Sequence, residues 1–493
     1  MFWSLTTYLT NNLSSFVLMI CLFRYLVLNK RDKRLPKGPM GIPLFGYLPF
    51  LGSNPFVTLW KLQKQFGPIY TIQLGEKSVV VLNDWESVRN ALRKDSFLGR
   101  PFITSFSLWN GIKSLIDEND IGCWREERRF FENFFRTNFD STCNNLKNLS
   151  TDLRSLVLSL KRSAENLKID IRKEIERYSN HFLFMLIFNR HHHSQRFNLI
   201  DSAILLRTIL SFYPIWMAKT ISKLIDLFNH SNLASFAKFF RNEVKIHSRS
   251  IENELSIRDL IDYYILEVHL KQDAAILMSI DKLRANCHVF LSFGNEAFLS
   301  SLEWSLILIA RFSNHQQSIY DEIMKVIGVK RIPAFKDEHR MPFTVAFINE
   351  VLRWRTVLPL NLIRRAIDDT SIMGHFIPKD TLVLANIWAV HHDSKIWDNP
   401  SKFNPYRFLT EDGKTLIDHE GFIPFSLGKR SCVAESFVRK WLFIFVVTIV
   451  QNFHIKSPNH REEIFDEKFS LTLRPKQNTN LIFHAREERF KEK

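Results

Sequence analysis

The sequence predicts a mainly α-helical chain with a small β region, folded as a single large domain behind an N-terminal membrane anchor. Most of the 493 residues fall in long stretches of helical periodicity. Two β-rich runs lie on either side of Gly75 and form a candidate hairpin. No Gly/Ser linker, low-complexity block or internal repeat divides the chain beyond about residue 50.

The anchor is expected over residues 1–28. The segment Phe2–Phe23 carries no charge and would span about 33 Å as a helix, close to the thickness of the bilayer's hydrocarbon core. Basic residues follow it and mark the cytosolic side. A cleaved leader is the alternative, although no positive region comes first. Residues 29–49, basic and Pro-rich, predict a stiff hinge, and the main domain is expected over residues 50–493.

The elements of the body follow from periodicity and from turn residues. The final helix is apolar nearly all round and is therefore expected to be buried. In chain order we expect a hairpin (68–83), a helix (84–95), an aromatic loop (96–120), helices (124–137, 146–190, 200–212, 232–250, 258–272, 281–311, 314–327 and 343–355), short β segments (364–384), a long loop (393–430) and a last helix (432–452).

Charge and cysteine content narrow the possible partners. The chain has 67 Lys and Arg against 51 Asp and Glu, a net charge of +16. Such a chain is drawn to nucleic acid, anionic membrane or acidic proteins, and the absence of a nucleic-acid motif favours the last two. Its five cysteines form no C-x-x-C pair. This argues against a disulfide framework or a zinc site and for a reducing compartment.

The most informative motif is the loop from Phe425 to Cys432. A cysteine after a glycine turn and before an apolar helix is suited to hold a haem iron by its thiolate. Gly428 permits a tight turn, and the following helix N-terminus favours the thiolate. Arg430 is placed to neutralise a haem propionate. The alternative for Cys432 is an inert, buried cysteine.

Other polar residues fit the same cofactor. Glu350 and Arg353 lie three apart on a predicted helix, and Arg407 would complete a buried network that fixes the loop. Trp124 and Arg128 lie four apart on one helix face, where they would contact a propionate. Each pair also has a simpler interpretation, as a surface ion pair or as core packing. One further propionate candidate is Arg365.

Taken together, these residues resemble a microsomal cytochrome P450, nearest the animal family-two, xenobiotic-metabolising branch. The resemblance spans the whole chain. It implies the cytochrome P450 fold, a haem (iron protoporphyrin IX) cofactor, and insertion of one oxygen atom from O₂ into a small lipophilic substrate such as a xenobiotic, fatty acid or steroid. It also implies an endoplasmic reticulum membrane location with a cytosolic catalytic domain, and electrons from NADPH through a flavoprotein reductase. Cys432 becomes the axial ligand and a catalytic residue, and the implied haem contacts are Trp124, Arg128, Arg365, Phe425 and Arg430.

The sequence departs from the family on the oxygen side. Aligned through Trp304, it has Phe293 at the position of a small residue and Ala297 at the position of the threonine, while Glu296 keeps the acid and is the expected proton donor. A positioned donor contributes about 10²–10⁴ in rate, and alanine lacks the hydroxyl. A substrate hydroxyl, or a serine one turn away, would have to replace it; the candidate serines are Ser292 and Ser300.

Two other functions therefore stay open. One is a haem protein that binds a hydrophobic ligand with weak or no monooxygenase activity. The other is an isomerase or a peroxide-driven enzyme, which has no need of the threonine. The pocket itself is expected to be apolar, formed by loop 102–116 and segment 208–220 and suited to a lipophilic ligand. Its candidate lining residues are Phe102, Phe106, Phe293 and Ala297.

Overall fold

A computed structural model shows the architecture of the chain. It describes residues 32–140, 154–160, 169–190, 204–228, 233–250, 257–270, 278–457, 466–470, 472–476 and 480–486. The predicted anchor over residues 1–28 lies outside this described part. Among the helices of the described part, none is long and apolar enough to cross a bilayer.

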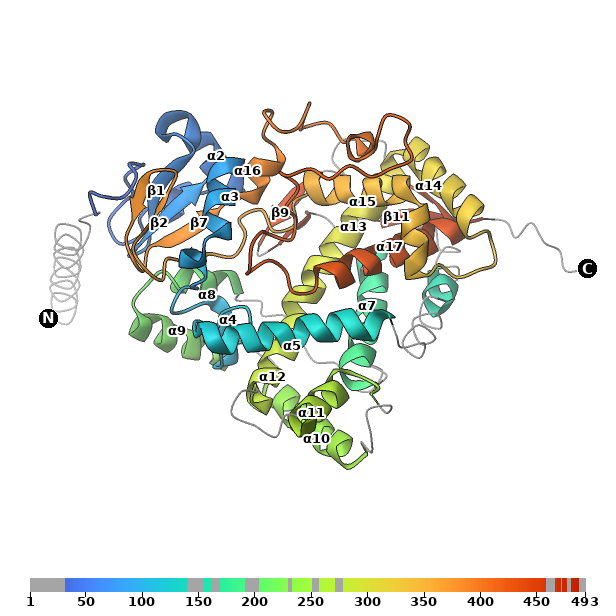
Figure 1. Cartoon of the computed structure of the whole chain (residues 1–493), viewed down its shortest axis with the longest axis horizontal. Coiled ribbons are helices and arrows are strands. Elements are labelled where there is room, and N and C mark those ends of the chain that lie inside the picture. The colour runs from blue at the N-terminus through green and yellow to red at the C-terminus, as the bar shows by residue number, and fades with distance from the viewer. Residues whose placement is uncertain are drawn as a thin grey trace, which may run out of the picture.

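The largest sheet lies at one end of the molecule, and helices with a few short strands make up the rest (Figure 1). The predicted hairpin is confirmed: β1 (Ile69–Leu74) pairs antiparallel with β2 (Lys77–Leu82), and Gly75 makes the turn at φ 53°. Strand β7 (Leu382–Ala385) adds to β2 in parallel, and β4 (Arg364–Arg365) closes the order β1-β2-β7-β4. The sheet thus brings residues near 365 and 382 against the N-terminal part of the chain.

The longest helical run crosses the molecule beside the candidate functional site. It starts at α12 (Ile280–Val289), passes through a π-helical turn (Phe290–Gly294) and continues as α13 (Asn295–Arg311), which agrees with the predicted helix 281–311. Ser279 caps its start by accepting a hydrogen bond from the backbone N–H of Lys282. The other α-helices are α2 (Pro55–Phe66), α3 (Trp85–Arg93), α4 (Ser105–Asn110), α5 (Ile121–Asp140), α7 (Ile171–Phe188), α8 (Ile204–Leu210), α9 (Ile215–Phe228), α10 (Leu233–Ser250), α11 (Leu260–Leu270), α14 (Ser313–Val326), α15 (Pro342–Trp354), α16 (Ile387–His391) and α17 (Glu435–Asn452).

The prediction of one helix over 146–190 is wrong within the described residues. Strand β3 precedes α7, because Ile169 and Asp170 pair with a strand far along the chain. Four C-terminal strands were not predicted, and they form two further small sheets, β10-β9 and β3-β11-β8. The remaining strands are β3 (Ile169–Asp170), β5 (Thr370–Ile372), β6 (His375–Ile377), β8 (Phe453–Lys456), β9 (Glu467–Phe469), β10 (Leu473–Pro475) and β11 (Asn480–Ala485).

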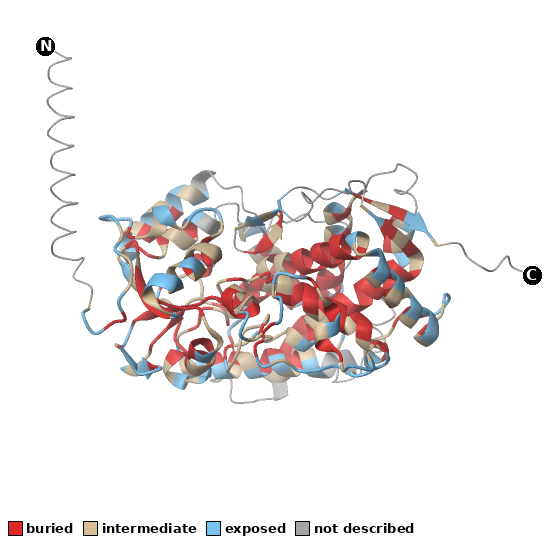
Figure 2. Cartoon of the chain, turned by 90° about the horizontal axis from the view of Figure 1, so that it is seen from above, coloured by how far each residue is buried: buried red, intermediate tan, exposed pale blue. Residues whose placement is uncertain are grey.

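The hydrophobic core lies around α13 and α17. Every residue of α17 from Trp441 to Gln451 is buried, as its all-round apolar sequence predicted. Figure 2 shows this buried band running through the helical part. Trp304 of α13 and Trp397, in the long loop between α16 and α17, are among the largest fully buried side chains. The rigid core therefore holds the two segments that form the site, the start of α13 and the loop that leads into α17.

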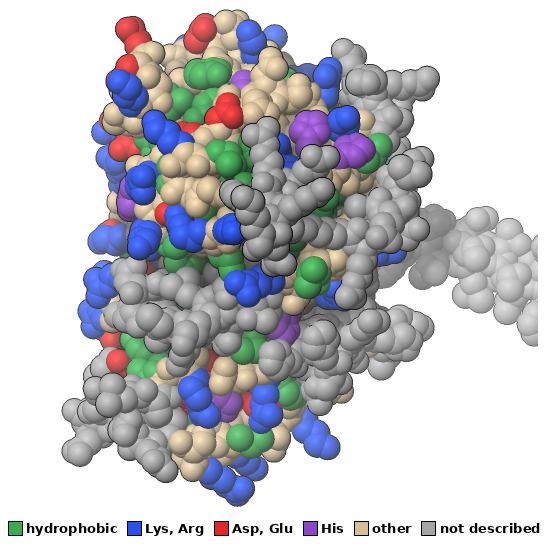
Figure 3. All heavy atoms as spheres, turned by 90° about the vertical axis from the view of Figure 1, so that its right-hand side faces the viewer, with side chains coloured by type: hydrophobic (Ala, Val, Ile, Leu, Met, Phe, Trp, Pro, Cys, Tyr) green, Lys and Arg blue, Asp and Glu red, His purple; other side chains and the backbone are tan. Residues whose placement is uncertain are grey.

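Two surface features bear on the predicted partners. In Figure 3, Lys and Arg side chains are spread over the face drawn and clearly outnumber Asp and Glu, in line with the positive net charge. The described part of the predicted hinge packs along β1, since the backbone N–H of Tyr47 donates to the carbonyl oxygen of Gln73 at 2.6 Å. Large apolar side chains stay exposed nearby, among them Met40 and Phe45.

Candidate functional site

The cysteine loop is closed by its own backbone. The N–H of Cys432 donates to the carbonyl oxygen of Phe425 at 2.9 Å. Gly428 has φ 77°, and a Cβ there would lie 2.0 Å from the carbonyl oxygen of Leu92 at the end of α3. The turn therefore requires glycine both for its conformation and for its close approach to α3.

Cys432 opens into a cavity of about 220 Å³. Cys432 keeps accessible surface and is one of the residues that line this cavity. Burial raises the pKa of Cys432 to about 11, against the opposing effect of a hydrogen bond from the backbone N–H of Ala434. The free thiol is thus protonated at neutral pH, and a metal ion would bind it with release of that proton. Phe425, Phe293 and Ala297 also line this cavity.

Three arginines line the same cavity. Arg100, Arg128 and Arg430 line it, together with Trp124, whose ring lies 4.2 Å from the guanidinium carbon of Arg430. The pKa of Arg430 falls to about 8, because the side chain is buried and because Arg100 is close. Like charges gathered in a buried place need an anion to offset them.

Arg364 strengthens that argument. Its side chain is fully buried, and within the described residues its Nε and Nη2 atoms have no hydrogen-bond partner. Burial, followed by repulsion from Arg100, Arg430 and Arg128, lowers its pKa well below the ordinary value. A ligand that carries a metal with affinity for thiolate, and carboxylates at its edge, would satisfy both the cysteine and the arginines. Haem is such a group, and the residues present fit it.

Arg365, predicted to contact a propionate, lies elsewhere. Its guanidinium pairs with Asp380 at 2.5 Å, donates to the backbone oxygen of Arg100 and stacks on Phe102 at 4.1 Å. Successive strand residues point to opposite faces of a sheet, so Arg364 and Arg365 occupy different faces of β4; neither lines the cavity itself. Phe102, predicted to line the pocket, is 57% exposed and lines neither cavity described here.

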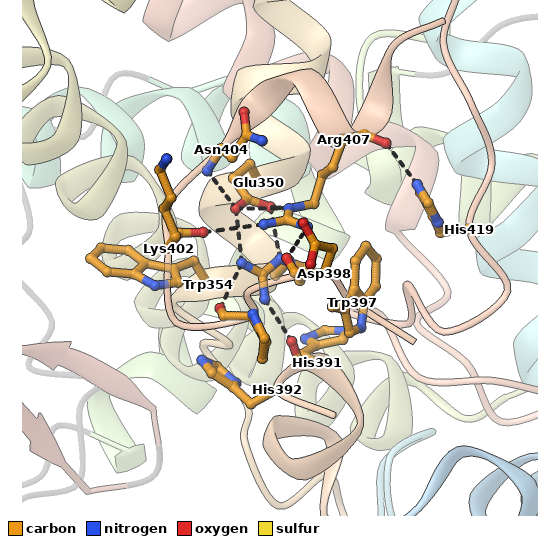
Figure 4. A network of polar contacts seen from close by, with 12 residues as sticks. Glu350, Trp354, His391, His392, Trp397, Asp398, Lys402, Asn404, Arg407 and His419 are labelled. Atoms are coloured by element: carbon orange, nitrogen blue, oxygen red, sulfur yellow. Dashed lines mark hydrogen bonds and ion pairs between the residues drawn. The ribbon is translucent and has the colours of Figure 1, made fainter. Parts of the chain in front are cut away.

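Glu350, Arg353 and Arg407 form the predicted buried network (Figure 4). Glu350 accepts from Arg353 at 2.7 and 2.8 Å and pairs with Arg407 at 3.1 Å. It also accepts the backbone N–H of Asn404 at 2.8 Å. Both charged side chains of the α15 pair are fully buried. The geometry of this prediction is confirmed: the network joins α15 to the long loop that precedes the cysteine.

His391 carries the network further toward the cysteine loop. Its carbonyl oxygen accepts from Arg353, while its Nε2 accepts the backbone N–H of Ile423 at 3.1 Å. The other ring nitrogen therefore holds the proton and donates to the hydroxyl of Thr356 at 2.7 Å. Burial and the positive charge of Arg353 keep the pKa of His391 well below its ordinary value, so the ring is neutral.

The oxygen side of the cavity is formed by the π-turn and the first turns of α13. Phe293 and Ala297 line it, as expected. Glu296, the expected proton donor, does not line the cavity; its carboxylate is paired with Arg172 of α7 at 2.6 Å. The same arginine pairs with Glu303 at 2.8 Å, which holds the acid against α7.

The serines of this helix are arranged differently from the prediction. Ser292 donates to the backbone oxygen of His288, and Ser300 lies beside Thr472 at 3.4 Å. Neither lines the cavity, whereas Ser301 does. Its hydroxyl donates to the carbonyl oxygen of Ala297, one turn away, at 2.9 Å. Sequence reasoning missed Ser301, although its spacing of four from Ala297 was a usable signal.

A second, larger cavity adjoins the first. It measures about 390 Å³, and its walls are mostly apolar. Phe106 and Phe212 line it, so segments 102–116 and 208–220 do contribute, while the side chain of Trp109 lies outside the described residues. The two cavities share part of one wall, formed by Arg100, Ile116, Leu358, Asn361 and Leu362.

Comparison with known proteins agrees with this site. The family profile described as Cytochrome P450 matches residues 36–483. The chain is 30% identical over 500 residues to cytochrome P450 1A1 of Sparus aurata, covering 94% of each protein. It is 31% identical over 471 residues to cytochrome P450 1A1 of Platichthys flesus, covering 90% of this chain and 89% of the relative. With its cysteine loop, its buried ion-pair network and this similarity over nearly its full length, the chain belongs to the cytochrome P450 family and is a P450 monooxygenase.

Proposed function

We propose that this P450 inserts one oxygen atom from O₂ into a small lipophilic substrate, with Cys432 as the axial ligand of its haem. The observation that carries this proposal is one thiol and three guanidiniums on the lining of a single cavity, with the fully buried Arg364 close enough to feel the charge of all three. Bound haem supplies the activation of oxygen. The larger, apolar cavity is the place for the body of the substrate.

The chain's own residues have separate tasks around the cofactor. Arg100, Arg128, Arg364 and Arg430 would hold the two propionates, which replaces Arg365 in the predicted set. The Glu350 network would keep the cysteine loop in place before the cofactor arrives, because its ions are already fully paired. Ser301 supplies a hydroxyl on the oxygen side of the cavity.

We extend the proposal to location and partners. Residues 1–28 would anchor the chain in the endoplasmic reticulum membrane, residues 29–49 would link the anchor to the body, and the domain from residue 50 would face the cytosol. Exposed apolar side chains fit a nearby lipid surface; they include Trp216 at 67% exposure. An NADPH-dependent flavoprotein reductase, an acidic partner for a basic chain, would deliver electrons. The relatives named above are cytochromes P450 1A1, and their names do not point to the family-two branch. Kinship with that branch rests on the sequence motifs and is part of this proposal.

The absorption spectrum of the reduced, CO-bound protein tests the ligand. A Soret band at the red-shifted position of thiolate ligation is expected for the wild type and for Cys123→Ser, which removes an exposed thiol as a matched control. Cys432→Ser is expected to lose that band. A wild-type band at the position of imidazole-ligated haem, or a protein that binds no haem, would overturn the proposal.

A second candidate is favoured by the oxygen side. Ala297 brings no hydroxyl, and the carboxylate of Glu296 is occupied by Arg172. Both features suit a haem protein that binds a hydrophobic ligand with little monooxygenation. Reductase-supported NADPH consumption without product would favour this candidate, whereas product formed with peroxide and without reductase would favour the peroxide-driven alternative.

A further inference from the structure

Two aromatic rings stand where the two cavities meet. Phe293 lines the smaller cavity and Phe106 the larger one. Their ring centroids are 5.3 Å apart and the rings are tilted by 66°, an edge-to-face contact. The linings of the two cavities are therefore joined by this ring contact.

Phe293 lies in the π-turn that leads into α13. A π-turn adds one residue to a helical turn and so changes the direction of the side chains that follow it. Phe290, at the start of the turn, packs against Phe131 of α5 with ring centroids 5.0 Å apart and also lines the smaller cavity. Phe293, three residues later, points into the cavity. The family pattern has a small residue at this position, so the ring is a feature of this chain.

Phe106 is held by a separate set of contacts. It is the second residue of the short helix α4, whose N-cap Thr104 accepts the backbone N–H of Ser107 at 3.0 Å. The hydroxyl of Thr104 donates to the buried carboxylate of Asp117 at 2.8 Å. That carboxylate also accepts the backbone N–H of Ser114 at 2.7 Å. Both ends of the segment that carries Phe106 are thus tied to one buried side chain.

Helix α9 packs against the segment that carries Phe106. The hydroxyl of Ser222 donates to the carbonyl oxygen of Leu108 in α4 at 3.2 Å. Figure 1 shows α4 beside α8 and α9, and residue contacts between α4 and both helices agree with this view. Phe106 itself is only 4% exposed. Its position is therefore fixed by the fold, while Phe293 has the cavity on one side.

We propose that Phe106 and Phe293 form an aromatic partition that selects ligands by the width of their reacting end. A slim end, either an unbranched chain or a single ring, passes the partition, and a branched end is held in the larger cavity. The ligand's body stays in that cavity, whose volume of about 390 Å³ lies in the range of drug-sized sites. This inference rests on the proposed function, because it takes the haem to occupy the smaller cavity.

Azole binding to the ferric haem tests the partition without turnover. The nitrogen of an azole shifts the Soret band only when it reaches the iron, so a spectral titration measures access. The probes are imidazole, 1-octylimidazole, which has a slim chain, and 1-tritylimidazole, whose three phenyl rings adjoin the ligating ring. In the wild type, 1-tritylimidazole is expected to bind at least about tenfold more weakly than 1-octylimidazole.

Variants identify the residues responsible. Phe293→Ala is expected to tighten 1-tritylimidazole binding about tenfold or more and to change 1-octylimidazole binding by no more than about threefold. Phe106→Leu, which keeps an apolar side chain on α4, is expected to act in the same direction. Phe376→Ala is the matched control, because it removes a partly exposed ring that lines neither cavity and should leave the ratio unchanged.

The reduced, CO-bound spectrum of each variant is recorded first. A variant without the thiolate band is replaced by Phe293→Leu, which removes the ring and keeps most of the volume. A wild type that lacks this band refutes the proposed function itself. With the band present, equal affinities for the slim and branched probes in the wild type, or ratios that do not change in the Phe293 and Phe106 variants, refute the partition alone.

Discussion

The carboxylate of Glu350 offers a direct test of how the cysteine loop is held. Replacing Glu350 by Gln keeps the size of the side chain and removes its charge. The carboxylate is fully buried and serves Arg353, Arg407 and the backbone of Asn404 at distances from 2.7 to 3.2 Å. In Glu350→Gln, two guanidiniums would remain without their counter-charge.

The expected cost follows from this geometry. Breaking a buried ion pair by removing one partner costs about 3–5 kcal/mol, mostly because the other charge is left uncompensated. Each arginine here keeps two backbone carbonyl oxygens as acceptors. Those bonds retain part of the stabilisation, so we expect a loss of about 3 kcal/mol, at the lower end of that range. The loss should appear both in global stability and in haem retention.

Urea unfolding of the haem-loaded protein measures both effects, by far-ultraviolet circular dichroism and by the Soret band. The control is Glu126→Gln, which makes the same chemical change in an ion pair with Arg129 at the surface. Surface pairs contribute about 0–1 kcal/mol, so this control should stay close to the wild type. A Glu350→Gln protein within about 1 kcal/mol of the wild type, or one matched by the control, would show that the network does not support the loop.

Three further predictions test other parts of the site. Gly428→Ala is expected to lose most haem binding, because its Cβ would lie 2.0 Å from the carbonyl oxygen of Leu92; haem content per protein measures this, and unchanged content would contradict it. The depressed pKa of His391 stabilises the fold fully above the unfolded-state pKa of about 6.5, and this contribution is lost as pH falls toward the folded-state value. His391 should therefore account for roughly 2 kcal/mol of the fall in unfolding free energy between pH 6.5 and 5, and His391→Gln should remove that share of the pH dependence; an equal slope in the variant would contradict the assignment. Ala297→Thr is expected to raise product formed per NADPH consumed in the reductase-supported assay, and an unchanged ratio would show that the missing hydroxyl is not limiting.

The elements that could be predicted from the sequence are those specified locally. The hairpin around Gly75 and the helix over 281–311 follow from β-rich runs and from a continuous helical period, and both were confirmed. Strand β3 was missed because two residues carry no periodic signal, and their pairing partner β11 lies about three hundred residues further along the chain. Short strands that are stabilised by distant partners have no local signature in a single sequence.

The same limit applies to the site: some of its features follow from local sequence patterns and others depend on distant contacts. The cysteine loop and the Glu350–Arg353 spacing are local patterns, and the structure brings these residues into the expected geometry. The choice between Arg364 and Arg365 depends on which face of β4 each residue occupies, and that is set by pairing with β7. The orientation of Glu296 depends on Arg172, which is 124 residues away in the sequence. Neither fact is visible without the fold.

The two sides of the site differ in what a change would cost the protein. Arg364 keeps a buried guanidinium with unpartnered donors beside three other arginines, an arrangement that burdens the fold unless an anion is bound. With no anion bound, an apolar residue at this position would make the fold more stable. Phe293 and Ala297 face the cavity instead, where their exchange leaves no buried charge. The oxygen side can therefore follow the shape and chemistry of the ligand, whereas the arginine side is tied to the cofactor.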